Sequence, residues 1–486
     1  MRRRIIIWVL IMIILITACN LGQVIKPTSE LPTPKVPLAD STEIVVDTTA
    51  TIPTPEAPSR VAEAGESLVT YVFSEGIGDI AVQVSLPDTP RYEDGAGVIV
   101  DIATFFTEAR RFHLSLDVTQ IGMIHISYLW PGKSDPSGAR SEGTYDYGGE
   151  DSIRALRDVI RFASGQITDR DGYYLDDLIA MTPLTDQVGL YAFSHPGIAA
   201  VNVLALCGDE LPNVGYLVGR ENPTQDAISS VELGYWDEDN RPVVNPLYVY
   251  PGSYTPTEIV IDYSAVRWDP TYTQPGWDYV GRAYLDLNGN GALDVTDFNF
   301  GPRIPTMYEK RYYSVALTRA LLESGALSES IWPEDLATPE EARETWPFRT
   351  SVHRYPELAS LTPNLKVMLV FADRDHVQPS LDKPHIHQAY DGFRHAAGLW
   401  TRLNPDLAYV AWVDAELVAT SPDNPANTEP GDWMDIRSWS YRDIRNASKL
   451  VPLAAVAEMA DRLHEGVWDD DLGEIIIDFP APTSHP

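Results

Sequence analysis

The chain of 486 residues carries 70 Asp and Glu against 36 Lys and Arg, which gives a formal net charge of −34 at pH 7. A surface this acidic repels phosphate backbones and anionic lipid headgroups, so nucleic-acid binding is excluded as a function. The length allows a large hydrophobic core, and 44% of the residues are hydrophobic. Stability must come from that core, because only two cysteines are present, Cys19 and Cys207.

The first residues have the pattern of a secretory signal. Three arginines, Arg2 to Arg4, precede an apolar run over 5–16 that is shorter than the roughly 20 residues of a membrane-spanning helix. The last residue of the run begins the stretch Ile-Thr-Ala-Cys over 16–19. This stretch resembles a bacterial lipobox, which implies that Cys19 is lipidated. We therefore expect a signal over 1–19 and an extracytoplasmic, lipid-anchored protein that contacts the membrane through its anchor alone.

Residues 20–60 are rich in Pro and Thr and lack apolar periodicity, which predicts an extended tether. From Leu68 onward strand and helix patterns alternate, which predicts an α/β fold with a mainly parallel sheet. The expected strands and helices of this first part are strands at 81–86, 98–102 and 123–128, a helix over 151–163, a strand that ends near Phe193 with a helix after it, and a strand at 214–218.

The alternation stops after about residue 225 and resumes near residue 346. The interval 226–345 is expected to be an inserted cap, with a strand at 259–261 and helices over 308–324 and from 338. The sheet domain then comprises 61–225 and 346–486. Its later part is expected to contain a strand at 365–371, a helix from Pro384, a strand at 408–413 and a last helix near 452–464.

A serine stands at the junction of a predicted strand and a predicted helix. Ser194 follows the apolar run that ends in Tyr191-Ala192-Phe193, and small residues from Gly197 onward begin the helix. A serine on such a strained turn is exposed at the edge of a sheet, next to the N–H groups of a helix start. Ala192 and Gly197 provide the small neighbours that the turn needs, and Pro196 is tolerated in a first helical turn.

The order of these features resembles the α/β-hydrolase superfamily over roughly residues 65–225 and 355–470. The stretch from Phe371 through Asp375-His376 to Pro379 resembles the acid-bearing loop of that family, with Ala372 where glycine is usual. The segment 131–149 resembles the loop before the helix that leads to the serine turn. The resemblance implies an α/β-hydrolase-like sheet with helices on both faces, Ser194 as nucleophile and Asp375 as the orienting acid.

The family places its catalytic histidine in the loop after the last strand, but that loop is expected here at 414–419 and contains no histidine. Four other histidines remain open as general base: His195, His376, His385 and His387. We take His385 as the best of them because the helix from Pro384 begins at the sheet edge where active-site groups gather. Each of the four also has an ordinary structural explanation, such as covering a helix start.

The oxyanion hole is expected to include the backbone N–H of His195, the residue after the nucleophile. In the family a second donor comes from a His-Gly turn after the third strand. The matching stretch here is 101–106, which has no glycine and begins with Asp101. A carboxylate at that place would oppose a developing negative charge, which favours weak or absent hydrolysis.

The insertion contains a calcium-loop pattern. Oxygen-bearing side chains recur at positions 1, 3, 5, 9 and 12 of a loop with glycine at position 6. The expected ligands are Asp286, Asn288, Asn290, the carbonyl of Ala292, Asp294 and Asp297. The loop resembles the calcium loops of dockerin-like and other extracellular modules of EF-hand type, which implies a structural Ca²⁺. An Asn- and Gly-rich turn without an ion is the alternative.

Two hypotheses for function follow from the sequence. The first is a secreted, membrane-tethered serine hydrolase that acts on an ester or amide bond of a small-molecule or peptide substrate. The second is a binding protein that kept the α/β-hydrolase fold and lost catalysis.

Overall fold

The structure is a computed structural model in which parts of the chain can be described. The described residues are 61–103, 112, 116–225, 232–237, 239, 241–249, 259–273, 279–301, 306–307, 310–345, 348–371, 384–406, 408–410, 412–413 and 450–469. Cys19 and the tether therefore lie outside the described residues, as does Asp375. None of the helices in the described part combines the length and the apolar character that a bilayer span requires.

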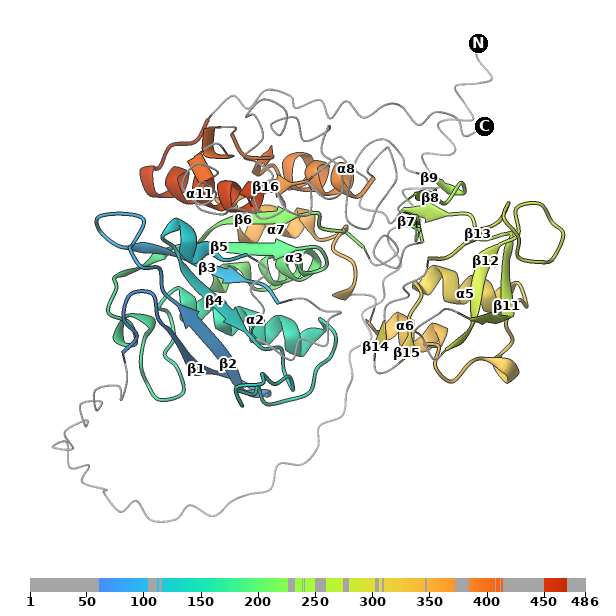
Figure 1. Cartoon of the computed structure of the whole chain (residues 1–486), viewed down its shortest axis with the longest axis horizontal. Helices are drawn as coiled ribbons and strands as arrows, with labels where there is room; N and C mark the ends of the chain where they lie inside the picture. The colour runs from blue at the N-terminus through green and yellow to red at the C-terminus, as the bar shows by residue number, and fades with distance from the viewer. Residues whose placement is uncertain are drawn as a thin grey trace, which may run out of the picture. The chain divides into compact units, whose positions relative to one another are not determined.

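The largest sheet of the described residues has eight strands in the order β1-β2-β4-β3-β5-β6-β16-β17 (Figure 1). Its strands are β1 (Ser67–Ser74), β2 (Gly78–Ser85), β3 (Ala96–Asp101), β4 (Ile124–Tyr128), β5 (Pro183–Phe193), β6 (Val214–Arg220), β16 (Lys366–Val370) and β17 (Trp400–Leu403). β2 pairs antiparallel with β1 and with β4, and every pair from β4 to β17 is parallel. The parallel strands therefore end at one edge of the sheet, where Ser194 follows β5.

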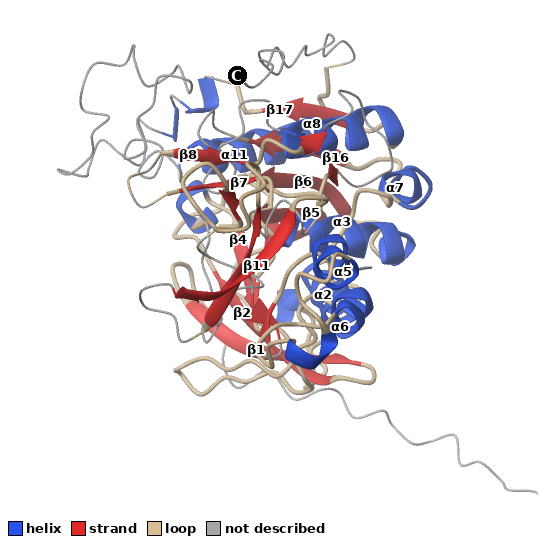
Figure 2. Ribbon diagram, turned by 90° about the vertical axis from the view of Figure 1, so that its right-hand side faces the viewer, coloured by secondary structure: helices blue, strands red, loops and turns tan. Residues whose placement is uncertain are grey.

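Helices cover both faces of this sheet (Figure 2). They are α2 (Glu150–Ala163), α3 (Pro196–Cys207), α7 (Tyr355–Leu361), α8 (Pro384–Asp391) and α11 (Leu450–Glu465), with short helices η1 (Val118–Ile121), η2 (Leu175–Asp177), η3 (Gly208–Glu210) and the π-helix η6 (Gly392–Ala396). α2, α3, α7 and α8 share one buried apolar cluster with the sheet, and α11 belongs to the cluster on the opposite face. The expected fold class, an α/β fold with a mainly parallel sheet, helices on both faces and a large insertion, is confirmed.

Between β6 and β16 the chain forms small sheets that are separate from the central one. The elements are β7 (Gly234–Trp236), β8 (Pro242–Val244), β9 (Tyr248–Val249), β10 (Val260–Ile261), β11 (Val266–Thr273), β12 (Val280–Leu285), β13 (Phe298–Asn299), β14 (Thr306–Met307), β15 (Lys310–Arg311), α5 (Val315–Glu323), η4 (Glu329–Ile331) and α6 (Pro339–Thr345). β11, β12, β13 and α5 enclose an apolar cluster of their own around Phe298, Phe300 and Leu317.

One expected strand is wrong. Residues 408–410 and 412–413 are helical, and the last strand of the sheet among the described residues is β17, which ends at Leu403. The apolar run Ala408–Val413 follows Asp406, whose carboxylate accepts a hydrogen bond from the N–H of Ala408 at 2.8 Å. This is the contact of a helix N-cap, and it starts a helical turn where hydropathy alone predicted a strand. The loop that follows the last strand therefore begins at Asn404.

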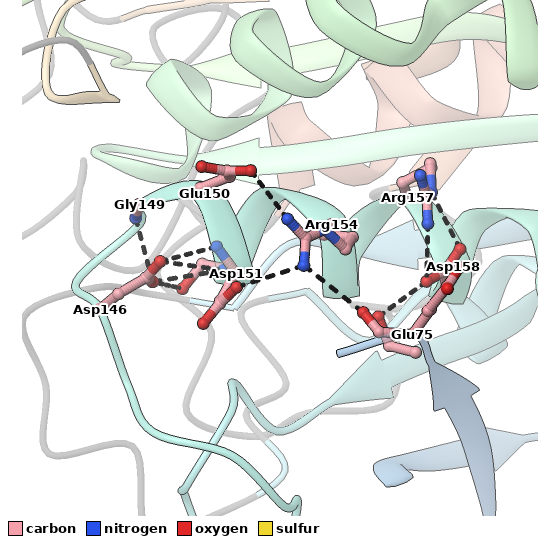
Figure 3. A network of polar contacts seen from close by, with 10 residues as sticks. Glu75, Asp146, Gly149, Glu150, Asp151, Arg154, Arg157 and Asp158 are labelled. Carbon is pink, nitrogen blue, oxygen red and sulfur yellow. Dashed lines mark hydrogen bonds and ion pairs between the residues drawn. The ribbon is translucent and has the colours of Figure 1, made fainter. Parts of the chain in front are cut away.

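A polar network fixes the start of α2 (Figure 3). The carboxylate of Asp146 accepts hydrogen bonds from the N–H groups of Gly149 and Asp151, at 3.1 and 2.7 Å, and from Ser152 Oγ at 2.5 Å. These donors belong to a helix start, where backbone N–H groups have no partner within the helix. Burial raises the pKa of Asp146, although the hydrogen bonds from Ser152 and Asp151 act in the opposite direction. Asp146 is thus a capping residue rather than a member of the serine site.

Candidate active site

Ser194 stands in a backbone conformation that serine rarely adopts. β5 ends at Phe193 and α3 begins at Pro196, so two residues turn the chain from strand to helix. The φ angle of Ser194 is +64°. This is the left-handed region, which costs a residue with a Cβ roughly 1–2 kcal/mol. Such a cost persists only where surrounding structure holds the residue in place, as at functional sites.

The turn is fixed by backbone hydrogen bonds on both sides of Ser194. The N–H of Ser194 donates to the carbonyl of Arg220 at the end of β6, at 2.8 Å, and its carbonyl accepts from the N–H of Gly197 at 3.0 Å. Pro196 is at the first position of α3, where the N–H that it lacks has no helical partner. His195 is 4% exposed and precedes this first turn, so its backbone N–H is at the helix start next to Ser194.

Asp101 does not stand alone at the end of β3. Its Oδ2 lies 3.3 Å from Nε2 of His125 on β4, and both side chains are buried. Asp101 lies opposite Tyr191 in the pairing of β3 with β5, three residues before the serine. The carboxylate is therefore directed to a histidine on the neighbouring strand. Sequence reasoning missed His125, because its contact with Asp101 depends on how β3 and β4 pair.

The candidate bases are in different environments. His385 is on the first turn of α8 and is 1% exposed. One turn later, Gln388 Oε1 accepts a hydrogen bond from Gln225 Nε2 at 2.9 Å. Gln225 follows β6, which ends at Arg220, the residue whose carbonyl accepts the hydrogen bond from Ser194 N–H. α8 thus packs against the segment that supports the serine turn. His387 is half-buried on the same helix, and His376 is outside the described residues.

The histidine that follows β17 in the described part of the chain is at the other end of the sheet, whereas His485 lies outside the described residues. His464, on the last turn of α11, stacks on Tyr92 with ring centroids 3.8 Å apart, and its Nδ1 lies 3.1 Å from Gln187 Oε1. Gln187 precedes Ser194 by seven residues along the strand, a distance of about 23 Å at 3.3 Å per residue. His464 is therefore excluded as the base for Ser194.

The expected calcium ligands are joined in one loop between β12 and β13. Asp286 Oδ1 and Oδ2 accept hydrogen bonds from the N–H groups of Asn290 and Gly291, both at 3.0 Å. The amides of Asn288 and Asn290 donate to Asp294 Oδ2 at 2.9 and 2.7 Å. Hydrogen bonds from Thr296, and then from these two amides, lower the pKa of Asp294 to about 2.

The donor chemistry of this loop fits a hard cation. Asp297 accepts hydrogen bonds from Leu287 and Asp294 N–H at 3.0 and 2.9 Å, so it connects the end of the loop to the beginning of the loop. Gly289 and Gly291 have φ angles of +71° and +77°, which provide the tight turns. In the described part of the chain no three His, Cys, Asp or Glu side chains are grouped as a metal site by themselves. Amide and backbone oxygens would have to complete the coordination, as in other Ca²⁺ loops.

Comparisons with known proteins give structural likeness only. No protein-family model and no curated protein matches the chain. A lidless α/β serine hydrolase from Xanthomonas campestris is 18% identical over 35% of this chain and 65% of that chain, with a TM-score of 0.23. The esterase domain of a Rhodothermus marinus protein is 12% identical (70% and 86% covered, TM-score 0.27), and an esterase from Rhizomucor miehei is 10% identical (82% and 85% covered, TM-score 0.37). Likeness at this level carries no information about substrate.

Proposed function

We propose that this protein is a serine hydrolase that acts on an ester or amide bond, with Ser194 as its nucleophile. The observation that supports this proposal is the φ angle of +64° at Ser194, between the end of a central parallel strand and a helix start. In this role the N–H of His195 is one oxyanion donor, Asp375 is the orienting acid and His385 is the general base. Lipid on Cys19 would hold the enzyme at the outer face of a membrane.

The test is covalent labelling of the soluble form that lacks residues 1–19. A fluorophosphonate probe is expected to form an adduct with Ser194, because a hydroxyl reacts with it readily only when a base and an oxyanion hole activate it. Ser194→Ala should abolish the adduct completely, as measured by mass spectrometry of the peptide that contains residue 194. His376, His385 and His387 are then replaced in turn, and the base is the residue whose loss removes labelling.

The placement of His464 favours a second candidate, a binding protein that has lost catalysis. Among the described residues, the histidine that follows β17 in the sequence, His464, stacks on Tyr92, far from Ser194. If folded natural protein gives no adduct at Ser194 in the presence of calcium, the hydrolase proposal fails and this second candidate replaces it.

We also propose that the loop over 286–297 binds Ca²⁺ and that the ion stabilises the insertion. Calcium at 100 times its dissociation constant is expected to stabilise the folded protein by about 2.7 kcal/mol. Asp286→Ala should abolish the increase in melting temperature between EGTA and Ca²⁺. Asp262→Ala is the control, because Asp262 also forms a local turn, with Ser264 N–H at 2.9 Å, but is outside the loop. Absence of binding heat at millimolar Ca²⁺ in calorimetry would contradict the proposal.

A further inference from the structure

The side chain of Asn222 joins the three segments that meet at the serine turn. Asn222 follows β6 by two residues and is 9% exposed. Its Nδ2 donates to the carbonyls of Ser194, Ala192 and Arg220, at 2.7, 2.9 and 3.2 Å. An amide group has two N–H bonds, and the two shortest contacts are with the carbonyl of Ser194 in the turn and the carbonyl of Ala192 near the end of β5. Asn222 therefore holds the end of β5 against the end of β6.

Two glycines leave the space that this side chain occupies. A Cβ at Gly197, in the first turn of α3, would lie 2.3 Å from Cβ and Cγ of Asn222. A Cβ at Gly219, which pairs with Ala192 across β5 and β6, would lie 2.2 Å from Asn222 Oδ1. A methyl group at either glycine would displace the amide. The start of α3 and the end of β6 are thus both shaped around the amide of Asn222.

The conformation of Ser194 needs such support. A positive φ at a residue with a Cβ is unfavourable by itself, so it depends on contacts that the relaxed conformation would lose. The amide of Asn222 donates to the carbonyl of Ser194 at 2.7 Å, while Ser194 N–H donates to Arg220. Both peptide groups of Ser194 are thereby held to the end of β6. Rotation of Ser194 to a negative φ would move its carbonyl away from Asn222.

We propose that Asn222 is a positioning residue that holds Ser194 at positive φ and so sets the direction of its hydroxyl. The catalytic consequence rests on the proposed hydrolase function, whereas the conformational role does not. Asn222 contacts backbone carbonyls and not the reacting hydroxyl, so it acts through Ser194. Its loss should therefore slow attack by Ser194 without removing any group of the catalytic machinery.

The first experiment compares two buried asparagines in the form that lacks residues 1–19. Asn222→Asp replaces the amide donor with a group of the same shape, and the rate of fluorophosphonate labelling should fall about 100-fold, as for a misplaced nucleophile. The control is Asn202→Asp on α3, where Asn202 is fully buried and its Nδ2 donates to Phe348 O at 3.1 Å. This control should lose stability but keep its labelling rate within about threefold. Equal loss of rate in both variants would overturn the proposal.

A double-mutant cycle tests the conformational role without any catalysis. Ser194→Gly removes the Cβ that makes positive φ unfavourable. The change in melting temperature caused by Ser194→Gly should be more positive in the natural chain than in the Asn222→Asp chain, by on the order of 2 °C. In the variant Ser194 can relax, so glycine gives no advantage. Equal effects in both chains would show that Asn222 does not hold Ser194.

These measurements separate the two proposals. If the natural chain forms no adduct, the hydrolase function fails, and the cycle still decides the role of Asn222. If Asn222→Asp does not fold, Gly197→Ala provides a second variant. The added methyl group displaces the side chain of Asn222, while the amide N–H groups of Asn222 are chemically unchanged. Labelling of Gly197→Ala at the natural rate would then overturn the proposal, and a loss of about 100-fold would support it.

Discussion

Gly189→Ala is expected to lower the free energy of unfolding by about 3 kcal/mol, at the upper end of the range for added core methyl groups. Gly189 lies in β5 and pairs with Tyr216 in β6, and the ring of Tyr216 covers it. A Cβ at Gly189 would lie 2.3 Å from Cζ and 2.6 Å from Oη of that ring. Tyr216 is 0% exposed and packs in one apolar cluster with α11, so the ring can give way only by displacing buried neighbours.

Urea unfolding of single and double variants checks this prediction. Tyr216→Leu removes the ring atoms that the new methyl group would meet, and it leaves a cavity of its own. The double variant Gly189→Ala with Tyr216→Leu should therefore lose less stability than the sum of the two single variants. Full additivity would contradict the steric explanation. A change below about 0.5 kcal/mol for Gly189→Ala would do the same, because it is the size of an ordinary surface substitution.

Strands with strong apolar runs could be predicted from the sequence, and weak ones could not. β3 is buried at each of its six positions, and its apolar run is visible in the sequence. β17 has the sequence Trp-Thr-Arg-Leu, which carries less apolar character than the run at 408–413. β17 is a strand because it pairs in parallel with β16, while Asp406 starts a helical turn in the more apolar run. Pairing and capping decide between these segments, and hydropathy describes neither.

The serine turn was predicted from local sequence, whereas the contacts that support it involve distant residues. Ser194, Pro196 and Gly197 are neighbours in the chain, so their pattern is readable. Asn222 is 28 residues after Ser194, and its role appears only when β5 and β6 pair. Asp101 and His125 are 24 positions apart in the sequence, so their contact is hidden in the same way. The sequence contains one signal of this contact, the glycines at 197 and 219, because both flank the space that the side chain of Asn222 occupies.

The insertion shows a different limit of sequence reasoning. The helix expected over 308–324 is shorter, because Lys310 and Arg311 form a strand, β15, and α5 begins at Val315. Buried Arg311 explains the difference, since its guanidinium donates to the carbonyls of Gly281 and Val280 at 2.5 and 3.1 Å. Ser314 then caps α5 by accepting a hydrogen bond from Leu317 N–H. The long-range contacts of Arg311 thus keep residues 310–311 in a strand, and the helix begins at Val315 instead of near residue 308.

Replacement of Glu458 on α11 should destabilise the protein strongly. Glu458 is 0% exposed on α11, and its Oε1 accepts hydrogen bonds from Arg402 on β17 at 2.7 Å and from Arg462 at 2.8 Å. Its Oε2 accepts from Asp406 N–H at 2.6 Å. Burial alone would lower the pKa of Arg462, but the hydrogen bond with Glu458 contributes to raising it. The carboxylate thus offsets the burial of two guanidinium groups and holds α11 to the last strand.

Glu458→Ala should therefore lower the free energy of unfolding by about 3–5 kcal/mol, because it removes the buried partner of two arginines. Arg402 and Arg462 then keep only their ion pairs with the more exposed Asp406 and Asp469, at 3.9 and 3.0 Å. Glu465→Ala, at the exposed last residue of α11, is the matched control and should stay within about 0.5 kcal/mol of the natural chain. Both are measured by urea unfolding at pH 7. If the two variants unfold at the same urea concentration, α11 is held to β17 by its apolar residues alone, since Val451, Ala455 and Met459 remain in place on the sheet.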